Sequence, residues 1–168
     1  MDIKAVTLLE LLVVILALVI LVGVINNVFF VGFNVWNEGF SRAEIRTDLG
    51  QALELISKNL RQAGSVDALT ESSITFSADL GGGDDTYRVY LYHEDDPEPN
   101  PPYTQDTYDL RWAKGTVDYG AGANLVTDIA QPTHIPFSQT GAVITMDLTA
   151  TRGDETLRLR SNVRPRNL

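Results

Sequence analysis

The stretch that decides the fold is Lys4-Ala5-Val6-Thr7-Leu8-Leu9-Glu10-Leu11-Leu12-Val13-Val14-Ile15, which opens an apolar run that reaches Trp36. Glu10 is the only charged residue in the 31 residues from Val6 to Trp36. A carboxylate at the centre of a bilayer costs about 2.5–3.5 kcal/mol on insertion scales. A charge kept in such a run therefore predicts a function for Glu10, unless the residue lies at the membrane surface, where most of this cost is relieved.

The residues after this stretch predict a single helix with two environments. No proline occurs in residues 6–63, so one continuous helix about 85 Å long is expected, with its end at Gly64. Residues 6–36 suit a membrane or a helical core, whereas residues 37–64 are amphipathic. One face of this second part carries apolar residues spaced by four, four, three and four: Ile45, Leu49, Leu53, Ile56 and Leu60.

Polar residues interrupt the apolar run in its last third. Asn27, Asn34 and Glu38 share one helix face and would form a polar seam for packing against other helices. Alternatively, Asn26 and Asn27 mark the outer edge of the membrane. A cleaved secretory signal peptide is disfavoured, because Asp2 cancels the charge of Lys4 and no Ala-x-Ala site follows the apolar core.

Beyond Gly64 the periodicity changes to that of strands. Alternation predicts a hairpin of residues 73–78 and 86–92 around a glycine turn, and further strands at 108–113, 134–137, 142–149 and 155–163. A proline- and acid-rich loop at 93–107 and a glycine-containing stretch at 115–123 separate them. One long helix before a run of strands predicts an α+β fold, with residues 65–168 forming an antiparallel sheet domain packed on the helix.

The charge distribution argues against nucleic acid as a partner. The net charge is −9, and residues 66–140 hold 13 acidic against 3 basic residues, whereas residues 141–168 hold 3 acidic against 5 arginines. Phosphate binding needs a basic surface. The arginines of Leu157-Arg158-Leu159-Arg160 instead alternate as in a half-buried strand with a solvated face.

No arrangement of residues predicts an enzyme. The chain has two histidines, no cysteine, no Gly-x-Ser-x-Gly and no phosphate or dinucleotide loop, so no catalytic residues are assigned.

Asp79, Asp84 and Asp85 flank the turn Gly81-Gly82-Gly83, and hard oxygen ligands on a tight loop suit Ca²⁺. The spacing of a dedicated calcium loop is absent, and Gly and Asp are also ordinary hairpin residues, so no metal ligands or other cofactors are assigned.

The N-terminal stretch resembles the processing site of type IV prepilins and type II secretion pseudopilins, with Ala5 where that family usually has Gly and Val6 where it usually has Phe. The resemblance implies cleavage of a leader, residues 1–5, and N-methylation of Val6. Glu10 would then meet the N-terminal amine of a neighbouring subunit. The helix end and the last strand are similar to those of J- or W-type minor pseudopilins.

The resemblance implies a pilin-like fold, a single-pass protein of the bacterial inner membrane with a cytoplasmic N-terminus, and an exported domain that later joins a fibre. Its partners would be other pilin subunits, the prepilin peptidase, and the assembly platform with its ATPase. A minor pilin or pseudopilin with a structural role is expected. The alternatives are a major pilin, or a signal-anchored periplasmic or extracellular binding or adhesion domain.

Overall fold

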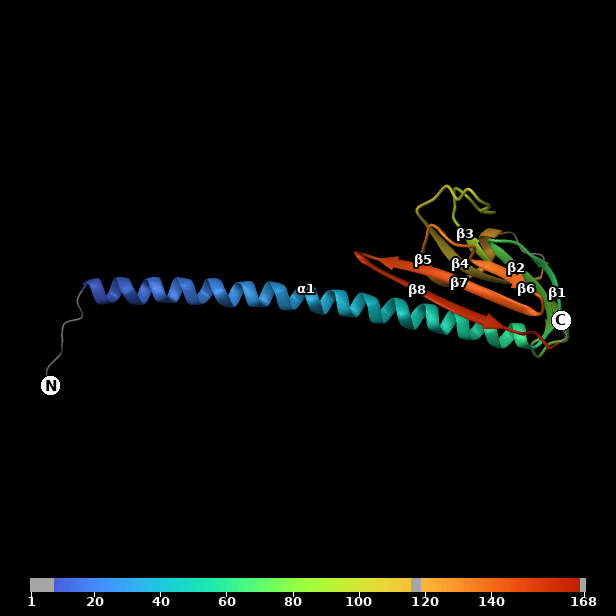
Figure 1. The fold of residues 1–168 in the computed structure, drawn as a ribbon, viewed down its shortest axis with the longest axis horizontal. Coiled ribbons are helices and arrows are strands. Elements are labelled where there is room, and N and C mark those ends of the chain that lie inside the picture. The colour runs from blue at the N-terminus through green and yellow to red at the C-terminus, as the bar shows by residue number, and fades with distance from the viewer. Residues whose placement is uncertain (1–7, 116–118, 167–168) are drawn as a thin grey trace. The chain divides into compact units, whose positions relative to one another are not determined.

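A computed structural model of the protein describes residues 8–115 and 119–166, which form one long helix followed by a curled antiparallel sheet (Figure 1). The elements are α1 (Leu8–Arg61), β1 (Ala63–Leu69), β2 (Ser73–Asp79), β3 (Asp84–Tyr92), β4 (Thr107–Lys114), the 3₁₀ helix η1 (Tyr119–Ala121), β5 (Ala123–Ala130), β6 (Phe137–Thr140), β7 (Val143–Arg152) and β8 (Glu155–Val163). The predicted α+β class is confirmed. The chain divides into two compact units, one ending at Phe40 and the other beginning at Ser41, and each is considered by itself.

The helix ends earlier than the glycine signal predicts. α1 stops at Arg61, and Gln62 donates its backbone N–H to the carbonyl of Asn59 (3.0 Å). Gly64 already lies in β1, where an added Cβ would contact the carbonyl oxygen of Ser77 at 3.8 Å. The expected end at Gly64 is therefore wrong by three residues, because pairing with β2 takes the chain into the sheet before the glycine is reached.

The sheet has the order β1-β2-β3-β4-β5-β7-β6, with β8 on the other side of β7. Residues 143–146 of β7 pair with β6, whereas Ala150 pairs with Ile129 of β5. Since β8 pairs with β7 along nine residues, β5 and β6 lie end to end on the opposite edge of β7. Every pairing among the described residues is antiparallel, and β1, β6 and β8 each pair there with one strand only.

Two strands escape prediction and one is misplaced. β1 has two register shifts and a non-alternating burial pattern, and β5 contains Asp128 at φ 62°, so neither shows a clean period of two. The strand predicted at residues 134–137 instead begins at Phe137. Pro136 has no N–H for a ladder, which explains this later start. The other predicted strands are observed with ends that shift by up to three residues, and β8 matches its prediction.

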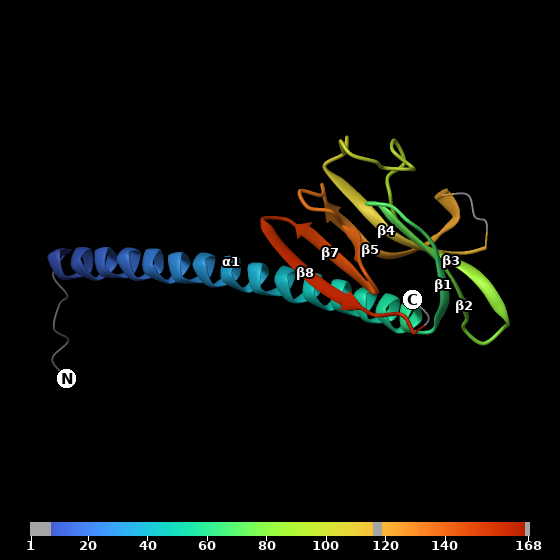
Figure 2. The ribbon, with the colours of Figure 1, turned by 45° about the vertical axis from the view of Figure 1, so that its right-hand side comes forward.

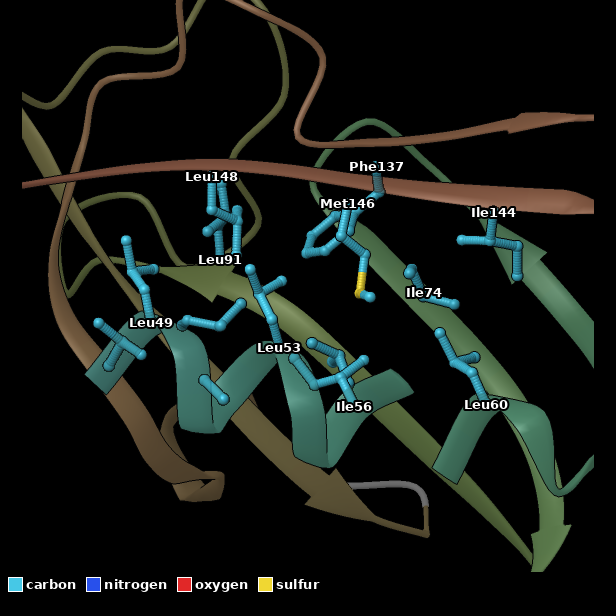
Figure 3. Close-up of a cluster of buried hydrophobic side chains, with 14 of the residues drawn as sticks. Leu49, Leu53, Ile56, Leu60, Ile74, Leu91, Phe137, Ile144, Met146 and Leu148 are labelled. Atoms are coloured by element: carbon cyan, nitrogen blue, oxygen red, sulfur yellow. The ribbon is translucent and has the colours of Figure 1, made fainter. Parts of the chain in front are cut away.

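One face of the second half of α1 provides the helical part of the core. The five residues predicted from spacing are all at most 5 % exposed: Ile45, Leu49, Leu53, Ile56 and Leu60. Figure 3 shows the last four of these facing side chains from β2, β3, β7 and the start of β6, including Ile74, Leu91 and Met146. The predicted amphipathic helix packed on a sheet is therefore confirmed.

Polar contacts fix the direction of the helix along the sheet. Arg42 contacts Glu155 (3.0 Å) and Ser57 contacts Ser161 (3.1 Å), so α1 and β8 run in the same direction. Fifteen helical residues rise about 22 Å and six strand residues about 20 Å, so the two elements stay nearly parallel. Arg152 at the end of β7 reaches Glu44 (2.8 Å), and Figure 2 shows this half of α1 running beside β8.

Two loops lie close to tyrosine side chains of β3 and β4. Tyr108 donates its hydroxyl proton to Asp96 (3.0 Å) and accepts the backbone N–H groups of Thr104 and Gln105, which ties the acid-rich loop to β4. Gly122 lies so close to Tyr90 that an added Cβ would overlap the tyrosine hydroxyl. The glycine of this stretch therefore allows a close approach to the sheet, a structural use for a motif that fails as a dinucleotide loop.

We predict that Ile56→Ala will lower the free energy of unfolding of the domain by about 2–4 kcal/mol, because it leaves a cavity where a fully buried side chain packs. Leu55→Ala is the matched control: Leu55 is 43 % exposed, so its truncation should cost under about 1 kcal/mol. Calorimetry of the full chain in detergent micelles measures both. Equal losses would contradict the burial of this helix face.

The domain should lose stability in acid through Asp147. Arg158 donates two hydrogen bonds of 2.6 Å to this carboxylate and holds the pKa of Asp147 below its ordinary value. A lowered pKa stabilises the fold above the unfolded-state value of about 4, and this contribution is lost as the pH falls through the folded-state pKa. Asp147→Asn should therefore destabilise the domain at pH 7. The difference in free energy of unfolding between this variant and wild type should become smaller at pH 3.

Denaturant midpoints at pH 7, 5 and 3 test this, with Asp154→Asn in the exposed β7–β8 turn as the control. A gap between Asp147→Asn and wild type that stayed constant with pH would show that the substitution acts through packing and not through charge.

Candidate functional site

The first part of α1 exposes apolar side chains on every side. In the unit that ends at Phe40, the large apolar residues from Leu8 to Phe40 are 47–83 % exposed. A helix that is apolar all round belongs in a membrane or a core of other helices. By length and composition α1 can span a membrane, a property that a signal sequence near an N-terminus shares. This segment is the candidate functional site, and we call residues 8–40 the apolar segment.

Glu10 lies within this surface. It is an exposed residue of α1, and its neighbours Leu9 and Leu11 are 74 % and 56 % exposed. The structure thus presents a carboxylate among apolar side chains on a face that other molecules can reach. Ala5 and Val6, the predicted processing residues, lie outside the described residues.

The C-terminal end of the apolar segment is aromatic. Trp36 lies between Phe33 and Phe40 along the helix, with ring centroids 6.4 and 6.0 Å away. Asn26, Phe29, Phe30 and Phe33 line a shallow hollow on the helix surface. Aromatic residues gather where a membrane-spanning helix meets the headgroups, so this composition suits the outer boundary of a span. Asn26, Asn27, Asn34 and Glu38 are all exposed, which is compatible both with a polar seam and with Asn26 and Asn27 at the membrane edge.

Two of the acids considered for calcium, Asp79 and Asp85, have protein partners. Asp79 Oδ1 accepts the backbone N–H groups of Gly81, Gly82 and Gly83 at 2.9–3.2 Å, which lowers the pKa of Asp79. Asp85 contacts the Lys114 ammonium at 2.7 Å. Within residues 8–115 and 119–166, no group of three or more metal-ligating side chains is found. The glycine turn therefore uses Asp79 to satisfy its own backbone.

His93 likewise has a local structural contact. Its Nδ1 accepts the backbone N–H of Asp95 at 3.1 Å, within a short bridge between His93 and Asp96. This contact orders the start of the acid-rich loop and gives the imidazole a role in the turn.

Comparison with known proteins finds no relative of this chain. No known protein family, no curated protein and no solved structure matches this chain.

We predict that Leu12→Arg, Leu16→Arg and Val19→Arg combined will release the protein from membranes. About 20 apolar residues favour insertion by roughly 6–12 kcal/mol, so a single arginine, at about 2.5–3.5 kcal/mol, is not sufficient. Three arginines cost about 8–10 kcal/mol and offset the gain. The measurement is the fraction of full-length protein that stays in the membrane pellet after alkaline carbonate extraction.

The triple alanine variant at the same positions is the control and should remain in the pellet. A wild-type protein recovered as a shortened, soluble chain would instead identify the apolar segment as a cleaved signal sequence and contradict membrane anchoring.

Proposed function

We propose that this protein is a prepilin that matures into a minor pilin or pseudopilin, a structural subunit of a type IV pilus or a type II secretion-like fibre. The observation that carries the proposal is Glu10, the only charged residue from Val6 to Trp36, in the part of α1 that exposes apolar side chains on all sides. It stands five residues after the resembled cleavage position, between Ala5 and Val6. The one long helix followed by an antiparallel sheet is consistent with a pilin-like layout.

The apolar segment needs two successive environments in this proposal. In the bacterial inner membrane, lipid covers its side chains, with the N-terminus in the cytoplasm and the domain exported. In the fibre, the same side chains pack against helices of other subunits. Exposed leucines, valines and isoleucines around the whole circumference suit both surroundings, because neither lipid nor a helix bundle requires a single apolar stripe.

Glu10 gives this packing its axial register. An apolar surface alone lets helices slide, since leucines contact leucines in many registers. In hydrocarbon, a carboxylate and an ammonium are each costly, and pairing offsets part of both costs. The methylated amine of Val6 in a neighbouring subunit would supply the positive charge. The main effect of the pair is therefore to specify one axial position of the helix. Its effect on the stability of the fibre is secondary.

The domain would lie outside the helical core of the fibre, where its acidic loops would meet other subunits or secreted cargo. The prepilin peptidase, the assembly platform and its ATPase are the further partners that the resemblance implies. Assignment as a minor subunit follows the resemblance of the helix end and last strand to J- or W-type pseudopilins. A major pilin would instead dominate sheared fibres.

We predict that protein extracted from its own membranes will begin at N-methylated Val6. Mass spectrometry of the N-terminal peptide measures this directly. An intact Met1 start, in cells that process their other prepilins, would contradict the proposal and favour a signal-anchored binding or adhesion domain.

Glu10→Ala should abolish incorporation into sheared fibres, by at least about tenfold, while membrane insertion and leader cleavage continue. Removing the charge lowers the cost of inserting the helix into the membrane. A loss of incorporation into fibres would therefore reflect the role of Glu10 in axial register and not in membrane anchoring. Glu54→Ala is the control, because it removes an exposed carboxylate from the same helix outside the apolar segment. Normal incorporation of Glu10→Ala would contradict the assigned role of Glu10.

A further inference from the structure

The sheet of the domain is open along β8. This strand pairs with β7 through nine consecutive residue pairs without a register shift, and it pairs with no other strand among the described residues. Figures 1 and 2 show it at the margin of the sheet. A long, regular outer strand is a template for a further strand, because its outer backbone groups continue the ladder.

The direction of the backbone groups of β8 follows from two contacts. β7 and β8 are joined by a two-residue turn, Gly153-Asp154, with Gly153 at φ 61° and Arg152 facing Glu155. In such a turn the closing pair is hydrogen-bonded, and bonded pairs then alternate along the ladder. Accordingly, the residues of β8 whose N–H and C=O groups point away from β7 are Thr156, Arg158, Arg160 and Asn162.

A second contact supports this assignment of the outward-pointing backbone groups of β8. Asp147, which faces Arg160, donates its backbone N–H to the carbonyl of Pro136 at 2.8 Å, on the opposite edge of β7. Asp147 therefore has no N–H to give to β8, and the N–H of Arg160 points to the open edge.

The buried face of the sheet is also incomplete at β8. On β7, Leu148 and Ala150 are 1 % and 2 % exposed. Their cross-strand partners on β8, Leu159 and Leu157, are only half-buried although they are on the same face. A further strand at β8 would cover these leucines if it carried apolar side chains on that face.

The solvated face of β8 is basic. Arg158 forms an ion pair with Asp147, and Arg160, which faces the same carboxylate across the ladder, forms no ion pair within the described part of the chain. Arg164 and Arg166 follow and are exposed. If two copies paired antiparallel around Leu159, Arg158 of one would lie opposite Arg160 of the other, and like charges facing each other destabilise a sheet. A partner with acidic side chains on this face fits, whereas a second copy of β8 does not.

The outer strand at the far end of the sheet, β1, is a poorer template. It has register shifts at two places, and Asp67 on this strand already binds the hydroxyl groups of Ser65 and Ser77 (2.6 Å each). Bulges of this kind are a common way to block an edge. The two edges of the sheet are therefore not equivalent.

We propose that β8 is a docking edge for an extended segment of another protein in which acidic and apolar residues alternate. The segment adds a strand antiparallel or parallel to β8, bonds to the outward groups of the four even-numbered residues, covers Leu157 and Leu159, and places its carboxylates beside Arg160. The inference concerns the domain alone and does not rest on the proposed fibre function.

The test uses the full chain in detergent micelles and a nine-residue probe peptide of alternating Glu and Val. Residue-resolved amide hydrogen exchange should slow at least tenfold at Thr156, Arg158, Arg160 and Asn162, while the amides of Leu157 and Leu159, already bonded to β7, should change little. Because the protein has a net charge of −9, general charge attraction does not favour an acidic peptide.

Two controls separate backbone pairing from charge. Replacing Glu by Lys in the peptide should abolish the protection, and so should N-methylation of its alternate amides. Arg160→Pro removes one outward N–H, and its ring points away from β7, so it should weaken peptide binding at least tenfold with the domain still folded. If this variant unfolds, the N-methylated peptide tests the same hydrogen bonds.

Three results would overturn the proposal. One is the absence of protection with the acidic peptide, and another is equal protection with the lysine peptide. The third is slow exchange of the four outward amides without any peptide: dependence on protein concentration would identify a second copy as the occupant, and independence would show that the chain closes its own edge.

Discussion

The fold depends on the contact between one face of α1 and the inner face of the sheet. No other helix longer than η1 occurs among the described residues, so Leu49, Ile56 and Leu60 provide the layer that covers β2, β3 and β7. Without them, the apolar face of a curled eight-stranded sheet would be open to water. The second half of the helix is therefore part of the domain, which explains why the compact unit begins at Ser41 and not at β1.

The same helix meets the opposite requirement in its first half. Apolar side chains there cover the whole circumference, and no described part of their unit buries them. A domain can bury one stripe of a helix, but only lipid or several other helices can surround it. The change from an apolar circumference to an apolar stripe thus divides the helix between two environments, and Glu10 is the charge that only the first environment makes costly.

Sequence reasoning located the features that are governed by regular periodicity. The spacing of Ile45 to Leu60 gave the buried face of α1, and the alternation in residues 155–163 gave β8 with its ends. It failed where a tertiary contact replaces the period: β1 and β5 contain bulges, and Asp128 takes a left-handed conformation beside Arg152 (3.8 Å). The open edge of β8 also could not be predicted, because no local pattern states which strand is last in a sheet.

The two proposed contact regions differ in the physics of recognition. An apolar helix surface gives affinity for almost any apolar neighbour, so selectivity there must come from a single costly group such as Glu10. A strand edge provides backbone hydrogen bonds to any extended chain, so selectivity there must come from side chains, and Arg160 with the two half-buried leucines defines which residues a partner needs at alternating positions. In each region, an attraction that many molecules share is made specific by one charged side chain, Glu10 on the helix and Arg160 on the strand edge. In the proposed fibre, the helix would enter a common helical core while the domain selects one particular partner.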